Sequence, residues 1–420
     1  MENAHLLFLD IGGTDIKVVF YNARTSKYSR LLRTATPALI KSSRGTREYN
    51  PQKILEVCQS LITNSGWKHS EKVKIYLSGQ MGCWLLTDEN NYPVTNVISW
   101  QDTRYIAYQK TAASNDFQSC AESNWVEKNG REFRPSIAPL GIYTYLREIG
   151  TKNKLRLHSL LSWISSSISN QGSHQIHLTD AASLGMVDLN KNDWLDFGGP
   201  FKNLIYPEIM DHNDWNLSGT VQNLVLSTAV GDQQASLYGA GLDKESVVVN
   251  IGTGGQIAYL GALEDSWTFQ KRPFFNGLVL NTKTHLPAGR ALAAYTKVLA
   301  SGDNTASDYE WMDKCALEVI PFSNLDLSKF EGIENEDSPT QWDAQFASTV
   351  VHSLINVYAN ILNENRPLIG DRKLIFAGGV GQKLSAISKY LALKTNLKFQ
   401  ISNSIETTIE GLQKLAQEQD

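Results

Sequence analysis

Two stretches of the chain share one pattern: an apolar run, a turn rich in Gly and Thr, and a second apolar run. They cover residues 6–20 and 246–260. Each stretch predicts two strands joined by a tight turn, because glycine permits the backbone angles that such turns require. Aligning Asp10 with Asn250 also aligns the Ile and the Gly that follow each of them, at an offset of 240 positions. The repeat predicts two related domains.

The two turns also suggest a function. Successive backbone N–H groups in a Gly/Thr turn can bind an anion, so two such turns could hold a polyphosphate between them. An ordinary hairpin, in which glycine serves only the turn, is the alternative for each stretch.

Helix, strand and glycine turn follow one another in both halves of the chain. Residues 51–62 carry apolar side chains at helical spacing, and residues 73–77 predict a strand. In the second half, residues 351–362 predict a helix and residues 373–376 a strand that ends at a glycine pair. This alternation predicts an α/β fold, in which ligands gather at the carboxyl ends of strands.

The length of 420 residues suits two domains. We place the boundary near residue 225, which gives domains of residues 1–225 and 226–420. The reason is that residues 213–223 are polar, whereas an apolar run begins at Leu224. We interpret residues 105–175, polar and helical in pattern, as an insertion or cap on the first domain.

Composition limits the classes of partner. The 39 basic and 43 acidic residues give a net charge of −4, which provides no electrostatic footprint for nucleic acid or an anionic membrane. No apolar stretch approaches the roughly 20 residues of a membrane span, and the apolar run at residues 6–9 is too short for a signal peptide. The four cysteines lack the spacing of a zinc site or a disulfide framework. We therefore expect a cytoplasmic protein that acts on small molecules.

Asp10 is the candidate metal residue. It stands where the first strand enters its turn, and a bare carboxylate there would repel phosphate. A Mg²⁺ ion held by Asp10 would neutralise the phosphate oxygens and remove this repulsion. The alternative is that Asp10 hydrogen-bonds its own turn. Lys17 in the next strand is a candidate phosphate contact, although a solvated strand lysine is an equal alternative.

Asp232 is the candidate catalytic base. It opens the short helical run at residues 232–239, so capping that helix would explain it equally well. Its position just before the second turn would also let it reach a hydroxyl beside a γ-phosphate. A base placed there would contribute about 10²- to 10⁴-fold in rate.

Residues 100–104, Trp-Gln-Asp-Thr-Arg, combine an aromatic face, a carboxylate, an amide and a guanidinium. Such a mixture suits a polyol, with its CH groups and many hydroxyls. An exposed ion pair of Asp102 and Arg104 is the alternative. The Ser-Gly-Gln-Met-Gly segment at residues 78–82 follows a strand and is similarly ambiguous. No P-loop, dinucleotide fingerprint, His-Glu-x-x-His or nucleophile elbow is present in the sequence.

Taken together, these segments resemble the FGGY carbohydrate kinases, members of the actin-like ATPase fold. The segments run nearly from end to end of the chain: Asp10-Ile-Gly-Gly-Thr14, Ser78-Gly-Gln-Met81, Trp100-Gln-Asp-Thr-Arg104, Asp180-Ala-Ala-Ser183, Gly231-Asp-Gln-Gln-Ala235, Asn250-Ile-Gly-Thr253, Ala377-Gly-Gly-Val380 and Glu406-Thr-Thr-Ile-Glu-Gly411. The resemblance implies two duplicated ribonuclease H-like domains with the active site in the cleft between them. It also implies ATP- and Mg²⁺-dependent phosphorylation of a sugar or polyol hydroxyl.

The resemblance further implies a role for each candidate residue. Asp232 would be the catalytic base and Asp10 the metal residue. The nucleotide would be bound by Gly12, Gly13, Thr14, Lys17, Gly252, Thr253, Gly254, Gly378, Gly379 and Gln382. The sugar would be bound by Gln80, Met81, Trp100, Asp102, Arg104, Asp232 and Gln233.

Two segments depart from the usual family pattern. Gly82 and Cys83 stand where ketose-phosphorylating members commonly have histidine, and residues 378–382 read Gly-Gly-Val-Gly-Gln in place of a three-glycine run. The identity of the sugar is left open, with sedoheptulokinase and xylulokinase as the most similar subfamilies. The oligomeric state is left open as well, with a homodimer as one option. A ROK-type glucokinase shares the opening motif but usually carries a Glu-x-Gly-His motif and a zinc loop, which are absent. A sugar or nucleotide sensor and a non-sugar ATPase of the same fold are the further alternatives.

Overall fold

The computed structural model describes residues 5–41, 45–68, 70–104, 112–133, 137–150, 154–169, 174–210, 219–221, 223–299, 306–321 and 344–418. The chain forms two compact units. Unit 1 comprises Met1–Gly239, Lys271–Val279 and Glu406–Asp420, and unit 2 comprises Ala240–Gln270 and Leu280–Ile405. The sequence predicts one boundary near residue 225, whereas the units divide after Gly239 and two later segments return to unit 1. Most of the polar stretch 213–223, on which that prediction rests, lies outside the described residues.

The main sheet of unit 1 is built around its first strand. β1 (His5–Ile11) pairs antiparallel with β2 (Asp15–Asn22) and parallel with β7 (Val73–Gly79). The strand order is β16-β17-β7-β1-β2-β3, with β18 beside β7 and β4 beside β2. The other strands are β3 (Lys27–Tyr28), β4 (Leu32–Ala35), β16 (Gly219–Val221), β17 (Leu224–Leu226) and β18 (Val230–Gly231). The predicted first hairpin and the predicted strand at residues 73–77 are both confirmed.

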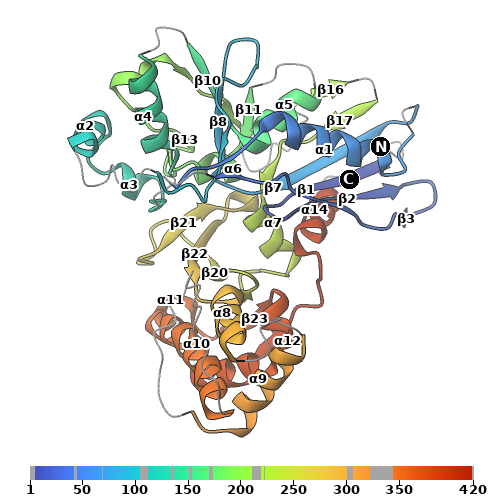
Figure 1. Ribbon diagram of the computed structural model, residues 1–420, viewed down its shortest axis with the longest axis vertical. Helices are drawn as coiled ribbons and strands as arrows, with labels where there is room; N and C mark the ends of the chain where they lie inside the picture. Colours follow the sequence, from blue (N-terminus) through green and yellow to red (C-terminus); the bar gives the residue numbers. More distant parts are fainter. Residues whose placement is uncertain are drawn as a thin grey trace. The chain divides into compact units, whose positions relative to one another are not determined.

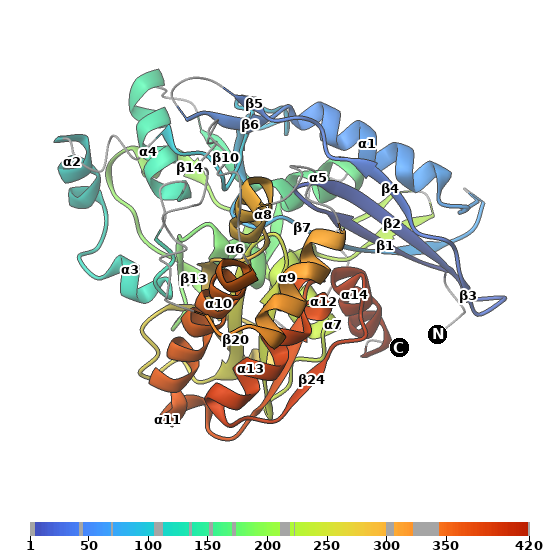
Figure 2. The same ribbon diagram turned by 60° about the horizontal axis from the view of Figure 1, so that its bottom comes forward.

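Helices cover both faces of this sheet. Alternate residues of β1, among them Leu7 and Leu9, are buried in one core with apolar residues of α1 (Pro51–Asn64) and α5 (Leu160–Ser169). Figures 1 and 2 show these two helices on one side of β1 and β2, and α14 (Thr407–Glu418) on the other. The amphipathic pattern at residues 51–62 thus correctly predicts α1, whose first turn is capped by the Asn50 side chain accepting from the Lys53 N–H.

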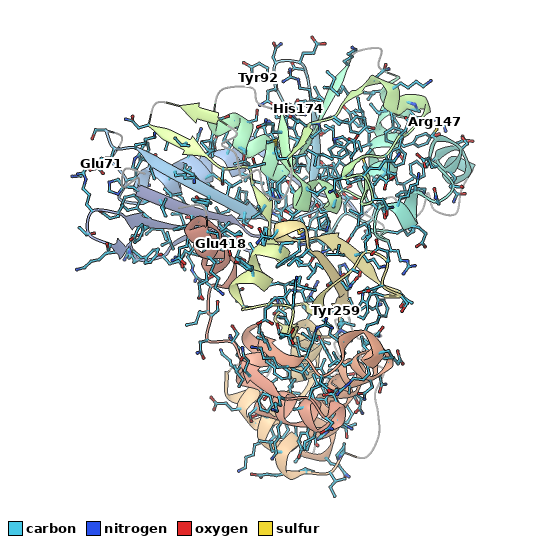
Figure 3. All side chains as sticks on the ribbon, turned by 180° about the vertical axis from the view of Figure 1, so that it is seen from behind. Glu71, Tyr92, Arg147, His174, Tyr259 and Glu418 are labelled. Carbon is cyan, nitrogen blue, oxygen red and sulfur yellow. The ribbon has the colours of Figure 1, made fainter. Side chains whose placement is uncertain are left out.

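Two glycines let α14 approach α7 (Asp232–Gly239) closely. A Cβ at Gly239 would lie 1.8 Å from the Thr407 carbonyl oxygen, and a Cβ at Gly411 would lie 1.9 Å from that of Ala235. No side chain fits at either position. The far end of α14 is also tied to α7, because Glu418, labelled in Figure 3, accepts a hydrogen bond from the Tyr238 hydroxyl.

The rest of unit 1 consists of a second sheet and short helices. The second sheet has the order β14-β10-β8-β9-β6-β5. Its strands and the neighbouring short ones are β5 (Ile40–Lys41), β6 (Arg47–Tyr49), β8 (Trp84–Thr87), β9 (Val97–Ile98), β10 (Leu155–Ser159), β11 (Gln175–His177), β12 (Val187–Asp188), β13 (Asp193–Trp194), β14 (Leu204–Ile205) and β15 (Glu208–Met210). The helices are α2 (Ala112–Cys120), α3 (Trp125–Lys128), α4 (Ala138–Ile149) and α6 (Leu178–Ser183). Most of β21 (Gln270–Pro273) also belongs to unit 1. The described part of the predicted insertion at residues 105–175 therefore lies in unit 1.

Unit 2 repeats the strand arrangement of unit 1. β19 (Ser246–Ile251) pairs antiparallel with β20 (Gly255–Gly261) and parallel with β23 (Lys373–Ala377), in the order β22-β20-β19-β23-β24. The other elements are β22 (Val279–Leu286), β24 (Phe399–Ile401), α8 (Gly289–Leu299), α9 (Ala306–Glu318), α10 (Ala344–Glu364), α11 (Arg366–Ile369), α12 (Gly379–Lys383) and α13 (Ser385–Thr395). The second predicted hairpin and the predicted helix and strand at 351–376 are confirmed. No helix in the described part of the chain is long and apolar enough to cross a membrane.

Candidate functional site

Asp10 lies buried near the end of β1, opposite Lys17 of β2. Burial raises the pKa of Asp10 to about 7; neighbouring Asp232 and Glu406 raise it as well, and Lys17 lowers it. The Lys17 ammonium group pairs with the Glu406 carboxylate at 2.6 Å. One carboxylate oxygen of Asp10, Oδ1, has no hydrogen-bond partner among the described residues. A buried carboxylate with an unused oxygen is poised to accept a ligand that carries positive charge or a proton.

The first turn, residues 12–14, is held from outside the hairpin. Thr36 donates its hydroxyl to the Gly12 carbonyl at 2.7 Å and its N–H to the Thr14 carbonyl at 2.8 Å. Gly13 and Thr14 are exposed, so the outer part of the turn faces solvent. The turn that the sequence assigns to phosphate is therefore accessible.

Gln80 lies beside this turn. Its N–H donates to the Ile11 carbonyl at 2.9 Å, and its side-chain oxygen receives the Tyr49 hydroxyl at 3.4 Å and the Cys83 thiol at 3.6 Å. With its oxygen engaged by two donors, the amide must present its nitrogen on the other side. That nitrogen, Nε2, is buried and has no partner among the described residues.

Asp232 lies partly buried at the first position of α7. Burial raises the pKa of Asp232 to about 6, against the lowering effects of backbone N–H groups, including those of Gln233 and Met81, and of the charge of Arg272. Met81 also contacts the end of β18, because a Cβ at Gly231 would lie 2.6 Å from the Met81 sulfur. The backbone donors around Asp232 favour its ionised form, which is the form that a general base needs.

A buried ion pair adjoins Asp232. The Arg272 guanidinium, from the returning segment 271–279, pairs with the Glu132 carboxylate and also donates to the side-chain oxygen of Gln233. All three side chains are buried. Charges taken out of water are tolerated only when they are paired and hydrogen-bonded, which this arrangement provides. The pair fixes Gln233, a predicted sugar contact, next to Asp232.

A third carboxyl group, that of Asp180 on α6, belongs to the same neighbourhood. Its side chain is buried and accepts a hydrogen bond from the Ser159 hydroxyl. Burial raises the pKa of Asp180 to about 7, the Ser159 hydrogen bond lowers it, and the charge of Asp232 raises it. Its Oδ1 lacks a partner among the described residues. Three carboxyl groups with raised pKa values therefore accumulate in one region of unit 1.

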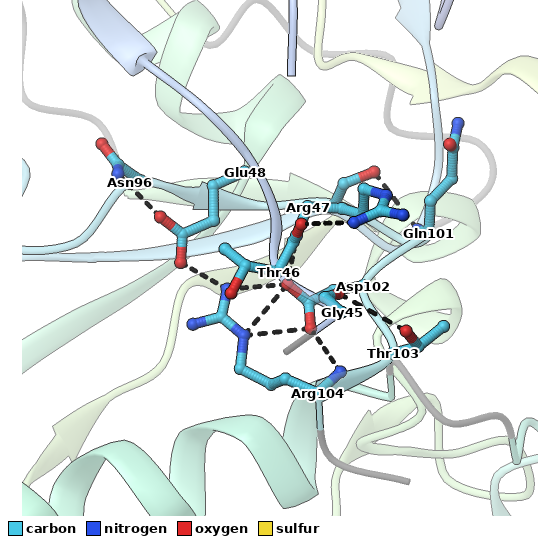
Figure 4. Close-up of polar contacts among 10 residues, drawn as sticks. Gly45, Thr46, Arg47, Glu48, Asn96, Gln101, Asp102, Thr103 and Arg104 are labelled. Atoms are coloured by element: carbon cyan, nitrogen blue, oxygen red, sulfur yellow. Dashed lines mark hydrogen bonds and ion pairs between the residues drawn. The ribbon is translucent and has the colours of Figure 1, made fainter. Parts of the chain in front are cut away.

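Residues 101–104 lie in a separate corner, and Figure 4 shows their polar contacts. Asp102 is fully buried and accepts from the Arg47 N–H at 2.8 Å and from the Arg104 guanidinium at 2.7 to 3.0 Å. Arg104 also pairs with Glu48, and Trp100 is half-buried against the core of unit 1. The ion pair of Asp102 and Arg104 therefore exists, with the carboxylate fully buried and the guanidinium partly exposed. Their predicted contact with sugar stays a prediction.

β6 connects this corner to Gln80. Successive side chains of a strand point to opposite faces, so Glu48 meets Arg104 while Tyr49 meets Gln80. The predicted sugar contacts Gln80, Met81 and Gln233 thus lie around Asp232 and the first turn. The Trp100–Arg104 segment is linked to them through one strand.

Unit 2 contains a cavity of about 440 Å³ next to the second turn. Its lining residues are Gly252, Thr253, Gly289, Arg290, Ala293, Tyr309, Gly379, Val380, Lys383 and Leu384. The turn is held by α8, since the Gly289 and Arg290 N–H groups donate to the Gly252 and Thr253 carbonyls at 2.9 and 3.1 Å. The cavity has two basic side chains, an aromatic ring and a glycine-lined wall, which together suit a nucleotide.

Gly254, Gly378 and Gln382, which are also predicted to bind the nucleotide, are neighbours in sequence of residues that line this cavity. Gly254 completes the turn, and its carbonyl accepts the Gly252 N–H at 3.0 Å. Gly378 has a φ of 80°, and a Cβ there would lie 2.4 Å from the Asn250 side chain, so glycine is required at that position. Gln382 donates its amide to the Ser402 and Ser404 carbonyls at 2.9 Å, which gives it a structural use. A contact of Gln382 with adenosine stays a prediction.

The residues fit Mg²⁺ only together with a substrate. Among the described residues, no three His, Cys, Asp or Glu side chains are grouped so as to hold a metal ion. Mg²⁺ is commonly held by one or two carboxylates, with phosphate oxygens and water completing its shell. Asp10, with its unused buried oxygen, satisfies the protein's part of that requirement.

Several residues of the site carry no signal that sequence reasoning could use. Glu132 and Arg272 lie 140 positions apart, and nothing in their local patterns relates them. Arg290 and Lys383 lie on helices that follow different strands. Asp180 and Glu406 belong to segments that carry the family resemblance, so their positions were signalled but their contacts were not.

Comparison with known proteins gives a consistent result. Residues 5–239 match the N-terminal domain of the FGGY family of carbohydrate kinases, and this segment ends where the first segment of unit 1 ends. The glycerol kinase of Corynebacterium glutamicum is 24% identical over 283 residues, covering 60% of this chain and 54% of that protein. The apulose kinase of Pectobacterium atrosepticum is 22% identical over 275 residues, covering 60% and 54%. The chain spans about half the length of the curated relatives it matches.

Solved structures resemble almost the whole chain. The xylulose kinase from Rhodospirillum rubrum has a TM-score of 0.78 at 14% identity, covering 98% of this chain and 90% of that one. The gluconate kinase from Lactobacillus acidophilus has a TM-score of 0.76 at 16% identity, covering 99% and 90%. At these identities the likeness shows the fold alone, and it confirms the predicted two-domain, actin-like ATPase architecture.

Proposed function

Since this chain belongs to the FGGY family of carbohydrate kinases, we propose that it transfers the γ-phosphoryl group of ATP to a hydroxyl of a small sugar or polyol. The observation that carries this proposal is the setting of Asp232. Its carboxylate is partly buried, is held by backbone N–H groups and Arg272, and lies near Asp10 and Gln80, which both have an unused polar atom.

In the proposed reaction, Asp232 accepts the proton of the acceptor hydroxyl. The oxygen of that hydroxyl forms a bond to the γ-phosphorus as the bond to the β–γ bridging oxygen breaks, and ADP leaves with the electron pair. Gln80, through its amide nitrogen, and Gln233, held by Arg272, orient the acceptor. Unit 1 contains the proposed base, the acceptor contacts and the first turn, and unit 2 contains the proposed nucleotide cavity.

The cavity beside the second turn is the proposed site for the nucleotide, with Arg290 and Lys383 facing its negative charge. Asp10 would hold Mg²⁺, which neutralises charge on the phosphate oxygens when bound. Lys17 would contribute a further cation, shared with Glu406.

The acceptor is proposed to be a ketose or polyol, such as one resembling xylulose or sedoheptulose. The relatives in sequence are named as glycerol and apulose kinases, and the structural neighbours as xylulose and gluconate kinases. A neutral acceptor is favoured over an acidic one, because a carboxylate on the acceptor would be repelled by the ionised form of Asp232, the proposed base. Glycerol, xylulose and sedoheptulose are therefore expected to be better acceptors than gluconate.

The test is a screen for ADP release with Mg²⁺, ATP and neutral acceptors of three to seven carbons. Gluconate serves as the acidic comparison and a reaction without acceptor as the background. Product formed with a neutral acceptor above background supports the proposal. ADP release at the same rate without acceptor indicates an ATPase, and binding of sugar or nucleotide without turnover indicates a sensor; either result overturns the proposal.

A further inference from the structure

The short helix α6 (Leu178–Ser183) contacts two backbone segments beside the proposed chemistry of unit 1. One hydroxyl near its start binds the end of β18, which leads directly into Asp232, and one hydroxyl at its end binds the turn that follows Gln80. The two hydroxyls belong to Thr179 and Ser183, four residues apart. Side chains at this spacing lie on the same face of a helix, one turn from each other.

Thr179 holds the end of β18, directly before the proposed base. Its hydroxyl oxygen accepts the Gly231 N–H at 3.1 Å, and its hydroxyl lies 2.8 Å from Nδ1 of His177. That ring nitrogen also accepts the Thr179 N–H, so it acts as an acceptor and the hydroxyl must donate to it. The donor and acceptor directions of the Thr179 hydroxyl are thereby fixed, and so is the backbone directly before Asp232.

Ser183 holds the turn after Gln80. Its hydroxyl oxygen accepts the Gly82 N–H at 2.8 Å and donates to the Asp180 carbonyl at 2.6 Å. Gly82 is buried with a φ of 71°, a conformation that glycine adopts without a steric penalty. A backbone of this kind needs an outside partner to hold it in one orientation, and Ser183 is that partner.

α6 is itself anchored in the core of unit 1. All six of its residues are buried, and the Asp180 side chain accepts from the Ser159 hydroxyl at the end of β10. The helix is therefore a rigid support for the end of β18 and for the turn at Gly82.

We propose that Thr179 and Ser183 are positioning residues that fix, from one helix, the strand end before the base and the turn after the acceptor contact Gln80. Thr179 acts through Gly231 on Asp232, and Ser183 acts through Gly82 on Gln80. This inference rests on the proposed kinase function for its kinetic consequences, and on the hydrogen bonds alone for its structural ones.

The two residues are expected to have opposite kinetic signatures. Thr179→Val removes the hydroxyl that accepts the Gly231 N–H. Because a slight displacement of a catalytic group is costly in rate, kcat should fall by about 10-fold or more, while KM for the sugar or polyol stays within about 2-fold. Ser183→Ala removes the hydroxyl that accepts the Gly82 N–H, so KM for the sugar or polyol should rise by about 10-fold with a smaller change in kcat. Thr179→Ser keeps the hydroxyl and should restore kcat.

Matched controls remove the same kinds of hydroxyl elsewhere in unit 1. Thr144→Val deletes a buried hydroxyl that donates to the Leu140 carbonyl, and Ser169→Ala deletes one that donates to the Ser166 carbonyl. Both variants are expected to lose some thermal stability and to keep wild-type kcat and KM.

Amide hydrogen exchange provides a readout that does not depend on activity. Thr179→Val should accelerate exchange in the peptide that contains Gly231, and Ser183→Ala in the peptide that contains Gly82, each without accelerating the other. If the exchange changes as expected but both variants keep wild-type kinetics, or if both change kcat and KM alike, the positioning roles are refuted. If wild-type protein phosphorylates no acceptor, the proposed function fails, and exchange unaltered at both glycines would separately refute the support by α6.

Discussion

The two hairpins of this protein share one architecture and differ in their charged residues. In each, an antiparallel pair is flanked by a parallel strand, β7 beside β1 and β23 beside β19. Asp10 is paired with Lys17 in the first hairpin, whereas Asn250 is paired with Gln256 in the second. The first hairpin therefore carries a carboxylate and an ammonium group at the positions where the second has two neutral amides.

The two turns also differ in length and in support. Four residues separate the paired Ile11 and Ile16, whereas three separate the paired Ile251 and Gly255. The first turn is tied to Thr36, beside the sheet, and the second to the start of α8. A duplicated unit has thus kept its strands while its turns have acquired separate supports. The first hairpin, with its charged residues, suits a metal ion and a nearby base. The second hairpin, with its neutral residues, suits the uncharged part of a nucleotide together with its phosphates.

The largest expected effect tests whether Asp232, which lies near the charged first hairpin, is the catalytic base. Asp232→Asn keeps the shape of the side chain and removes its ability to accept a proton, so kcat should fall by about 10²- to 10⁴-fold. Nucleotide affinity, measured by calorimetry, should remain near wild type because the proposed nucleotide cavity lies in unit 2. Full activity of this variant would remove Asp232 as the base.

The next effect tests the difference between Asp10 and Asn250 directly. Asp10→Asn gives the first hairpin the residue of the second, and kcat/KM should fall by about 10- to 100-fold with a higher Mg²⁺ requirement, measured by Mg²⁺ titration of initial rates. The reciprocal variant Asn250→Asp should have a smaller effect and leave the Mg²⁺ requirement unaltered. Equal Mg²⁺ dependence of Asp10→Asn and wild type would contradict the metal role.

Lys17 provides a smaller test of the same comparison. Lys17→Gln replaces the lysine with the amide found at Gln256, and KM for ATP should rise by about 10-fold because one cation near the phosphates is lost. Glu406→Gln keeps Lys17 but removes its 2.6 Å ion-pair partner, so this variant should not raise KM for ATP. If both variants raise KM equally, the ion pair matters as a structural unit and Lys17 is not a phosphate ligand.

The smallest effect concerns the pH dependence of stability. Burial raises the folded-state pKa values of Asp10 and Asp180 to about 7 and that of Asp232 to about 6, above the value near 3.9 of an unfolded chain. Between about pH 4 and 7 the folded state then binds more protons than the unfolded state, so these groups lose their stabilising contribution as the pH rises. Asp180→Asn should therefore raise the free energy of unfolding at pH 8 by about 1 kcal/mol or more relative to wild type, and less at pH 5.

This stability prediction is checked by urea denaturation at the two pH values. Glu89→Gln, which removes an exposed carboxylate, is the control and should change stability little at either pH. A loss of stability at pH 8 in Asp180→Asn would indicate that the ionised carboxylate is stabilising, contrary to its raised pKa.

The sequence predicts the local elements of this fold well, because their signals are local. Two apolar runs around a Gly/Thr turn identify each hairpin, and helical spacing identifies α1 and α10. The pairing of Asp102 with Arg104 is also predicted, but as an exposed ion pair, because the Arg47 N–H that helps to bury and satisfy Asp102 comes from 55 positions away. The differing turn lengths are visible only once the strand register is known.

The extent of each unit is what the sequence predicts least. Residues 271–279 and 406–420 join unit 1 through tertiary contacts that have no local signature. The contacts of the candidate site are hard to predict for the same reason, since Arg272 and Glu406 belong to the two returning segments. Motif resemblance identifies Asp10, Gln80 and Asp232 as candidates, but it does not identify the ion pairs that hold their surroundings.

The packing of α14 against α7 also determines the order in which the two units can finish folding during synthesis. The ribosome releases a chain from its N-terminus at about 5–20 residues per second, and domains generally fold as they emerge. Unit 2 has all of its residues once position 405 is available, whereas α7 still lacks the helix that covers it. Gly239 meets its partner surface only when residues 407–411 arrive. Unit 1 therefore starts before unit 2 but is completed after it, and the helix that opens with Asp232 is covered only after the residues of unit 2 have been made.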